Sequence, residues 1–419
     1  MNQGKYIFAQ LTDFLPRRVF DRLVEKYSGN KKIRTFTCWN QMLCMIFGQL
    51  TARDSMRELM LSLEAHKSKY YHLGFGATVS RTNLGKANRN RDYRIYEEFA
   101  YTLIAEARNS YNKNDFEVKV DGNVYAFDSS TIDLCLNVFW WAEFRKHKGG
   151  IKLHTLYDVK TSIPTIVLVT NAKVHDVNML DELSYEKGSF YIMDKGYVDF
   201  TRLHKLHTCG AYFVTRAKDN MRFRRMYSRE VDKTTGIKCD QIGILETYKS
   251  LKAYPDKLRR VKYYDEELGR EFVFITNNME LSAEEVALLY KNRWQVELFF
   301  KWIKQHLKVK SFWGTTMNAV KTQVYCAIIT YCLVAIVAYK LKVNRPIYEI
   351  LQILSFSLLD KTPVREILTN CDYKNVKELN YKQLKISWDY VPSSELIYEI
   401  THIIIFYFVI VCRGMYYKR

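Results

Sequence analysis

A single glutamate, Glu297, lies in a strongly basic stretch of the sequence. From Tyr290 to Lys321 there are seven lysines and arginines and no other acidic residue. A carboxyl group in such surroundings stays ionised at neutral pH, which makes it a poor general acid and a good ligand for a hard divalent cation. The alternative is an ordinary amphipathic helix with a solvated polar face. The local pattern alone does not decide between the two.

The stretch from Tyr290 to Lys304 contains no Gly or Pro, and its apolar spacing predicts one continuous helix. At 100° per residue, four polar side chains fall within an arc of about 60°. They are Tyr290, Arg293, Glu297 and Lys304. Apolar residues between Leu288 and Leu307 occupy the opposite side. We therefore expect one buried face and a narrow polar strip, with Trp294 beside that strip.

Two aspartates earlier in the chain follow apolar segments. Asp128 comes at the end of the predicted strand VYAFDSS, and Asp194 ends the predicted strand FYIMD. Sites in α/β sheets are commonly built at the carboxyl ends of strands. Taken alone, each aspartate is more simply explained as a turn former or helix cap. Together with Glu297, however, they form a set of three carboxylates that suits divalent cations.

The region from about 120 to 315 resembles the insertion-sequence transposases of the DDE class, and within them the insertion sequence four family. The resemblance rests on YAFDSSTIDL, FRKHKGGIKLHTLYD, TNAKVHD, FYIMDKGY and the spacing Y-x2-R-x3-E-x6-K. Tyr290, Arg293, Glu297 and Lys304 match that last spacing at every position. The resemblance implies an α/β fold: a ribonuclease-H-like catalytic domain with a β-rich insertion between the second aspartate and the glutamate. Some relatives stack a flipped base on a tryptophan of the insertion, but residues 195 to 293 contain no Trp.

DNA cleavage and joining are in-line displacements at a phosphodiester, which two Mg²⁺ ions about 3.5 to 4 Å apart promote by stabilising the attacking and leaving oxygens. The expected catalytic residues and metal ligands are Asp128, Asp194 and Glu297, with Mg²⁺ as the cofactor and Mn²⁺ as a substitute. The expected DNA-binding residues are Tyr290, Arg293, Trp294, Lys304, Arg145, Lys146, Lys148 and Lys152. A hard-cation site does not need imidazole, so structural or phosphate-binding roles are preferred for His147, His154 and His175.

The net charge of +19 indicates an anionic partner, with nucleic acid first and an anionic membrane surface second. The uncharged run from Val324 to Tyr339 has 16 residues, whereas a spanning helix needs about 20, so a buried core helix is preferred. Nine scattered cysteines without zinc-binding spacing fit buried thiols in a reducing compartment. The N-terminus shows no signal-peptide core. We therefore expect a bacterial cytoplasmic protein, associated with the nucleoid when bound to DNA, and no membrane partner.

The spacing of apolar and polar residues predicts five segments. They are a helical DNA-binding domain (1–114), the first part of the catalytic domain (115–200), a β-rich insertion separate from the catalytic sheet (201–282), the remainder of the catalytic domain (283–345) and a helical C-terminal region with a role in dimerisation (346–419). A hairpin is expected at Asp121–Gly122, and a helix near 175–186. The helical domain carries a basic surface whose members are Arg81, Lys86, Arg89, Arg91 and Arg94.

The expected function is that of a transposase. It would bind the inverted repeats of its element as double-stranded DNA, pair them through a homodimer, cleave them and join them to target DNA. The resemblance implies excision through a hairpin. Three alternatives stay open: a nuclease or resolvase on the same fold without strand transfer, a catalytically inactive DNA-binding protein derived from a transposase, and a membrane-associated protein.

Overall fold

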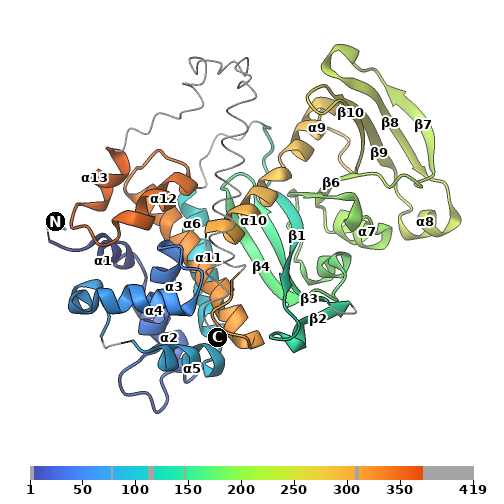
Figure 1. Ribbon diagram of the computed structural model, residues 1–419. Helices are drawn as coiled ribbons and strands as arrows, with labels where there is room; N and C mark the ends of the chain where they lie inside the picture. Colours follow the sequence, from blue (N-terminus) through green and yellow to red (C-terminus); the bar gives the residue numbers. More distant parts are fainter. Residues whose placement is uncertain (1–3, 77–78, 112–117, 146–147, 307–310, 371–419) are drawn as a thin grey trace, which may run out of the picture. The chain divides into compact units, whose positions relative to one another are not determined.

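The first part of the chain is helical. The computed structural model describes residues 4–76, 79–111, 118–145, 148–306 and 311–370 (Figure 1). Side-chain oxygens of Thr37, Ser55 and Ser80 cap three of the helices by accepting a backbone N–H. The helices before residue 112 are α1 (Ile7–Thr12), α2 (Arg17–Lys26), α3 (Cys38–Leu50), α4 (Met56–Ala65), α5 (Arg81–Asn90) and α6 (Arg94–Tyr111). The predicted helical texture is thus confirmed.

One long apolar helix, α11 (Met317–Lys340), lies at the centre of the helical part, in contact with α3, α5 and α6. Within the described ranges it alone is long and apolar enough to cross a membrane, and 94% of its apolar window is buried inside the protein. The structure therefore places it as a core helix. Two further helices follow, α12 (Ile347–Ser357) and α13 (Val364–Thr369). The apolar tail beyond residue 370 lies outside the described residues.

Four cysteines of the described part are buried free thiols, and they are Cys38, Cys44, Cys326 and Cys332. Burial raises the pKa of the Cys44 and Cys326 thiols, so both stay protonated. The expectation of buried thiols holds for this group, whereas Cys135 and Cys209 are exposed.

A mixed sheet follows the helices. The strand β1 (Val124–Leu134) pairs antiparallel with β3 (Lys148–Asp158), which pairs with β4 (Ile163–Asn171) and with the short β2 (Glu143–Arg145). On its other edge β1 pairs parallel with β5 (Phe190–Met193), and β5 pairs parallel with β6 (Tyr212–Arg216). The helix α7 (Phe200–Thr208) forms the crossover between β5 and β6. Tyr101 of α6 and Tyr325 of α11 both donate to the carbonyl of Val167 in β4, which ties the helices to the sheet.

The β-rich segment continues this same sheet, and here the sequence-based prediction was wrong. It comprises β7 (Phe223–Arg229), β8 (Ile237–Leu245), α8 (Tyr248–Ala253), β9 (Leu258–Asp265) and β10 (Arg270–Thr276). The strand β10 pairs antiparallel with β6, and the order β6-β10-β9-β8-β7 extends the sheet without a break. The arrangement depends on pairing between strands that are distant in the sequence, so the local alternation of apolar and polar residues does not predict it.

A buried ion pair anchors the extension next to the following helix. Arg259 of β9 is 1% exposed and donates to both carboxylate oxygens of Asp240 in β8. Its guanidinium also donates to the carbonyl of Leu281, one residue before the cap Ser282 of α9 (Ala283–Lys291). Because a buried charge must be paired and hydrogen-bonded, this contact fixes the place where α9 begins.

Two further local predictions differ from the structure. The described part of the expected hairpin at Asp121–Gly122, residues 118–123, forms no strand. A Cβ on Gly122 would lie 2.0 Å from the carbonyl oxygen of Gly188, so the glycine permits a close approach of two backbones. The segment expected to be a helix near 175–186 forms a 3₁₀ turn, Asp176–Glu182, whose side chains Met179 and Leu180 are buried.

Truncation of Leu333 tests the placement of α11. Leu333 is fully buried, so Leu333→Ala should lower the free energy of unfolding by about 2–5 kcal/mol. The matched control Leu61→Ala removes the same atoms from a side chain that is 63% exposed, and should change it by less than about 0.5 kcal/mol. Urea unfolding followed by circular dichroism measures both. Equal small effects would mean that α11 is not part of the core.

Candidate active site

The parallel register of β1 and β5 places the two aspartates side by side. Phe127 of β1 is the partner of Met193 in β5, and Asp128 and Asp194 are the next residue on each strand. Neighbouring strands lie about 4.8 Å apart, so the two carboxylates start from adjacent backbone positions. Asp128 is not at the end of its strand as predicted, because β3 pairs with β1 as far as Leu134. The strand that ends here is β5.

Arg293 joins two of the three carboxylates. Its guanidinium donates from Nη1 to Oδ2 of Asp128 at 2.8 Å and from Nη2 to Oε1 of Glu297. The Arg293 side chain is 14% exposed. Such a planar fork binds two carboxylates at once, and a lysine does not reproduce it. Arg293 of the predicted polar strip therefore contacts both Glu297 of the same strip and the first aspartate.

Asp194 is held by a second arginine, Arg216 of β6, which sequence reasoning missed. Its Nε and Nη2 donate to Oδ1 of Asp194 at 3.0 and 2.6 Å, and the hydroxyl of Tyr290 donates to the same oxygen at 3.2 Å. The register explains the contact: Met193 pairs with Thr215, so Arg216, the last residue of β6, lies next to Asp194, which directly follows β5. The sequence YFVTR shows a basic residue near the end of an apolar run, but this pattern predicts a contact with Asp194 only if the pairing of β5 and β6 is known.

The two aspartates have different proton affinities. Burial is the largest cause that raises the pKa of Asp128 to about 6, and the charges of Glu297 and Asp194 add to it while Arg293 opposes it. Burial also acts upward on Asp194, but hydrogen bonds from the Lys195 backbone and from Arg216 outweigh it, so the pKa of Asp194 lies below its ordinary value of 3.8. Burial is thus the main reason why Asp128 binds a proton more readily than Asp194 does.

The helix that carries Glu297 is divided. The structure has α9 ending at Lys291 and α10 (Trp294–His306) starting three residues later, with a turn at Asn292 and Arg293. The predicted continuous helix was therefore wrong, since the backbone N–H of Arg293 bonds to the Tyr290 carbonyl, three residues back. Tyr290 packs its ring on Phe274 of β10, with 4.7 Å between ring centroids. The break turns Tyr290 toward Asp194 while Arg293 faces Asp128.

Two other residues of the strip lie close to this centre. Lys304 donates from Nζ to the carbonyl of Thr131, three residues beyond Asp128 on β1, at 2.8 Å. Trp294 is 53% exposed and stands at the rim of a cavity of about 820 Å³ beside the carboxylates. The lining of this cavity includes basic residues of the site and several aromatic side chains. They are Arg216, Phe272, Phe274, Tyr290, Arg293 and Trp294.

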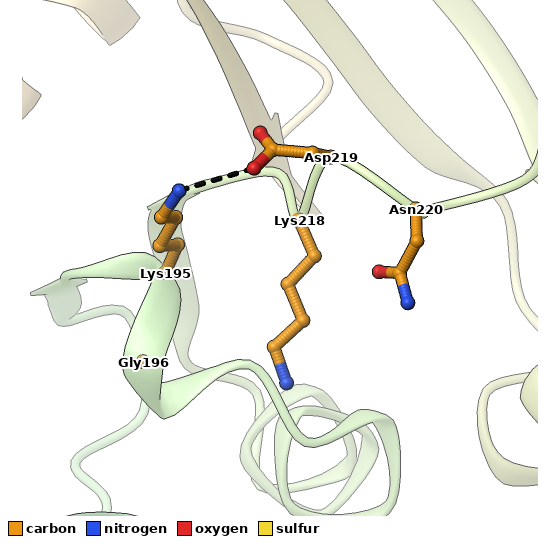
Figure 2. Close-up of a pocket in the computed structure, with 5 residues that line it drawn as sticks. All are labelled: Lys195, Gly196, Lys218, Asp219 and Asn220. Carbon is orange, nitrogen blue, oxygen red and sulfur yellow. Dashed lines mark hydrogen bonds and ion pairs between the residues drawn. The ribbon is translucent and has the colours of Figure 1, made fainter.

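A smaller hollow lies at Lys195 and Gly196, which follow Asp194 in the chain (Figure 2). It measures about 470 Å³ and is lined by Lys195, Gly196, Lys218, Asp219 and Asn220. Lys195 forms an ion pair of 3.2 Å with Asp219, which is 92% exposed. The Lys218 ammonium donates to the carbonyl of Val198 and so braces the turn that follows Asp194.

Among the other basic candidates, the structure describes the side chains of Lys148 and Lys152, and neither forms an ion pair with Asp128, Asp194 or Glu297. Lys148 is exposed at the start of β3, seven residues from the Thr155 that pairs with Asp128, or roughly 23 Å along the strand. Lys152 is 15% exposed and already forms an ion pair with Asp176. The side chain of Arg145, and Lys146 altogether, lie outside the described residues.

The histidines agree with the preference for roles outside catalysis where the structure describes them. His154 is fully buried, and its ring bonds to the hydroxyl of Thr170. Burial lowers the pKa of His154 to about 4, so its ring is neutral. His175 is exposed. His147 lies outside the described residues.

The donor set fits a hard cation in its chemistry, because all three acidic side chains offer carboxylate oxygens. Within the described ranges, however, no three His, Cys, Asp or Glu side chains are grouped so that they could hold a metal ion. The physical reason is that Arg293 lies between Asp128 and Glu297, while Arg216 and Tyr290 take Oδ1 of Asp194. The arginines neutralise the acids in this arrangement.

Comparisons with known proteins identify the family. The model of the transposase DDE domain matches residues 120–333, and a domain of unknown function, DUF4372, matches residues 3–76. The transposase-named protein y4zB of Sinorhizobium fredii is 34% identical over 273 residues, which cover 63% of this chain and 73% of that protein. A second relative is named as a transposase for insertion sequence element IS5377 of Geobacillus stearothermophilus and is 32% identical. The match covers 49% of this chain and 54% of that relative. A third relative, named as a transposase for insertion sequence element IS4SA of Synechocystis, is 24% identical. The match covers 61% of this chain and 71% of that relative.

The chain therefore belongs to the DDE transposase family, a family of enzymes that act on DNA. The family match spans β1 through most of α11 and so includes both aspartates, Arg216 and Glu297. This confirms the resemblance to insertion-sequence transposases and the enzyme class expected from the sequence.

Replacement of Arg216 tests whether it holds Asp194. Arg216→Ala should lower the free energy of unfolding by about 1–3 kcal/mol at pH 7, because it leaves a half-buried carboxylate without its strongest partner. Lys195→Ala breaks an exposed ion pair and should cost less than about 1 kcal/mol. Urea unfolding at pH 7 and pH 3 measures both.

The pH dependence has a definite sign. The folded pKa of Asp194 is depressed, so the ion pair stabilises the fold above the unfolded pKa and is lost as the pH falls through the folded pKa. The cost of Arg216→Ala should therefore shrink between pH 7 and pH 3. A cost equal to that of Lys195→Ala, or one that does not change with pH, would contradict the assigned contact.

Proposed function

We propose that this protein is the transposase of an insertion sequence: it binds the terminal inverted repeats, cleaves the DNA ends and joins them to target DNA by cut-and-paste chemistry. The observation that carries the proposal is the convergence of Asp128, Asp194 and Glu297 around Arg293 and Arg216. Membership of the DDE family supports the reaction class. The sequence resemblance supports excision through a hairpin at the transposon end.

We propose that the three carboxylates hold Mg²⁺, for which Mn²⁺ substitutes. Divalent ions bound there would activate a water or 3′-hydroxyl and stabilise the attacking and leaving oxygens of the phosphodiester. The fit rests on the all-oxygen donor set and on the adjacent positions of Asp128 and Asp194 at the end of β5. The depressed pKa of Asp194 keeps that carboxylate ionised and ready to act as a ligand at neutral pH.

The basic side chains around the carboxylates are proposed to bind the scissile strand. Arg293 and Arg216 present planar guanidinium groups, which bind phosphate oxygens in the same forked geometry as carboxylates. Lys304 extends this surface along β1, and Tyr290 supplies a hydroxyl donor. Trp294, half exposed at the rim of the larger cavity, is placed to contact a base or sugar of that strand.

The domain organisation is proposed on the same basis. The sheet from β4 through β6 corresponds to a ribonuclease-H-like core, and β7 to β10 form the insertion before α9 and α10. We propose that the helical segment before residue 114 reads the transposon ends, and that two copies pair the ends as a homodimer. A contribution of residues 346–419 to that dimer stays a prediction.

A nuclease or resolvase on the same fold would use the same carboxylates without strand transfer. An inactive transposase-derived protein would bind DNA without cleaving it. The packing of all three acids against arginines favours an intact site over the inactive alternative.

A supercoiled plasmid that carries one element tests the function. With Mg²⁺, the wild type should excise the element and yield insertions in a second plasmid, whereas Asp194→Asn should reduce cleavage by at least about 100-fold. The matched control is Asp219→Asn, which makes the same chemical change on the exposed acid of the neighbouring hollow and should cleave like the wild type.

The products separate the alternatives. Equal cleavage by wild type and Asp194→Asn would remove the proposed site. Cleaved plasmid without insertions would favour the nuclease, and absence of cleavage by the wild type would favour the inactive protein.

A further inference from the structure

A basic cavity lies between α5 and the segment that leads into α11. Its volume is about 680 Å³. Three cationic side chains of α5 line it, and they are Arg81, Lys86 and Arg89. Thr315 and Thr316 line the opposite wall, beside the first turn of α11. No acidic residue lines the cavity.

The three cations differ from their basic neighbours. Arg91 is buried and donates to the carbonyl of Thr37 and to Gln41, and Arg94 forms an ion pair with Asp92. These two arginines, grouped with the others by sequence, are therefore structural. Arg81, Lys86 and Arg89 are exposed and form no ion pair with any described residue. An unpaired cluster of this kind is available to an anionic ligand.

The walls of the cavity are fixed relative to one another. The side-chain amide of Asn318, in the first turn of α11, donates to the carbonyls of Asn88 and Arg91 at the end of α5, at 2.9 and 2.6 Å. The indole N–H of Trp141, in the segment between β1 and β2, donates to the carbonyl of Thr315 at 2.7 Å. The cavity is thus joined both to the core helix and to the end of the strand that carries Asp128.

The spacing of the cations suits several consecutive phosphates. Arg81 and Arg89 are eight residues apart on one helix, which is about 12 Å along the axis. One DNA strand has a phosphate roughly every 3.4 Å of duplex axis, so the row covers about three nucleotide steps. A free phosphate ion would occupy only one position of the row.

We infer that this cavity is a second DNA-binding site, which holds the phosphate backbone of a duplex at a distance from the reacting bond. The inference rests on the proposed function, because it assigns part of the same DNA substrate to residues outside the carboxylate centre. The cavity combines residues of α5 with residues 313–319, which come more than 220 positions later in the chain. The second wall consists of Trp313, Gly314, Thr315, Thr316 and Ala319, and none of these side chains carries a charge that would repel a phosphate.

Gly85 provides a sharp test. It lines the cavity between Arg81 and Lys86, and a Cβ added there meets no atom within 4 Å. Gly85→Glu places a negative charge among the three cations, and Gly85→Gln places an uncharged side chain of the same shape. Both changes favour the helix over glycine, so a difference between them reports charge alone.

The measurement is binding of the full chain to a 30-bp duplex of arbitrary sequence, with EDTA present, by fluorescence anisotropy at several salt concentrations. Gly85→Glu should bind more weakly, and its plot of log K against log salt should be shallower by about one unit, as for the loss of one phosphate contact. Gly85→Gln should match the wild type. The double variant Arg81→Ala/Arg89→Ala should lose about two units. The control Lys249→Ala/Lys252→Ala removes the same number of charges from exposed positions of α8, outside the segment proposed to read the ends, and should lose none.

Distinct outcomes overturn distinct claims. Equal salt slopes for Gly85→Glu and Gly85→Gln, with a wild type that cleaves the element plasmid, would overturn the second site and leave the proposed function standing. Inorganic phosphate bound by the wild type and not by Gly85→Glu, with equal duplex affinity, would assign the cavity to a free anion and also overturn the inference. A wild type that neither binds the duplex nor cleaves the plasmid would overturn both.

Discussion

Repulsion between three carboxylates is the constraint around which this structure is organised. Two like charges about 4 Å apart at an effective dielectric constant near 20 repel by about 4 kcal/mol, so such a cluster exists only with cations between its members. Arg293 supplies a cation to Asp128 and Glu297, and Arg216 supplies one to Asp194. Burial raises the pKa of Asp128, the charges of Glu297 and Asp194 add to that effect, and Arg293 opposes it. The parallel strands β5 and β6 and the break between α9 and α10 are what bring these cations to the acids.

The same balance of charge links the architecture to DNA chemistry. A guanidinium that pairs with a carboxylate also binds a phosphodiester in the same forked geometry. A site built from acids and arginines therefore has partners for a divalent ion and for the DNA backbone within a few ångströms. The aromatic cavity beside Arg216 and the hollow at Lys195 adjoin this centre, whereas the basic cavity at α5 is a separate site. Among the described residues, no cysteine or histidine cluster could bind a metal ion.

Sequence reasoning located the acids because each has a local signal. Glu297 is the lone acid of a basic stretch, and the two aspartates directly follow apolar residues. The same reasoning missed Arg216, since its place beside Asp194 depends on the parallel pairing of β5 and β6, and it did not foresee that Lys152 forms an ion pair with Asp176. The break before Trp294 has no Gly or Pro to announce it. The contacts of Arg216 and Lys152 and the helix break depend on tertiary packing between distant segments, so the local sequence around each residue does not predict them.

The central claim is that Asp128, Asp194 and Glu297 together bind divalent cations against DNA. Diffraction from crystals of the protein grown with a transposon-end duplex and Mn²⁺, recorded at the manganese edge, locates the ions directly. The account predicts an anomalous peak about 2.2 Å from oxygens of both Asp128 and Asp194, with Arg293 moved from the carboxylates toward a phosphate. A duplex bound in the site with no manganese peak between the two aspartates would contradict it.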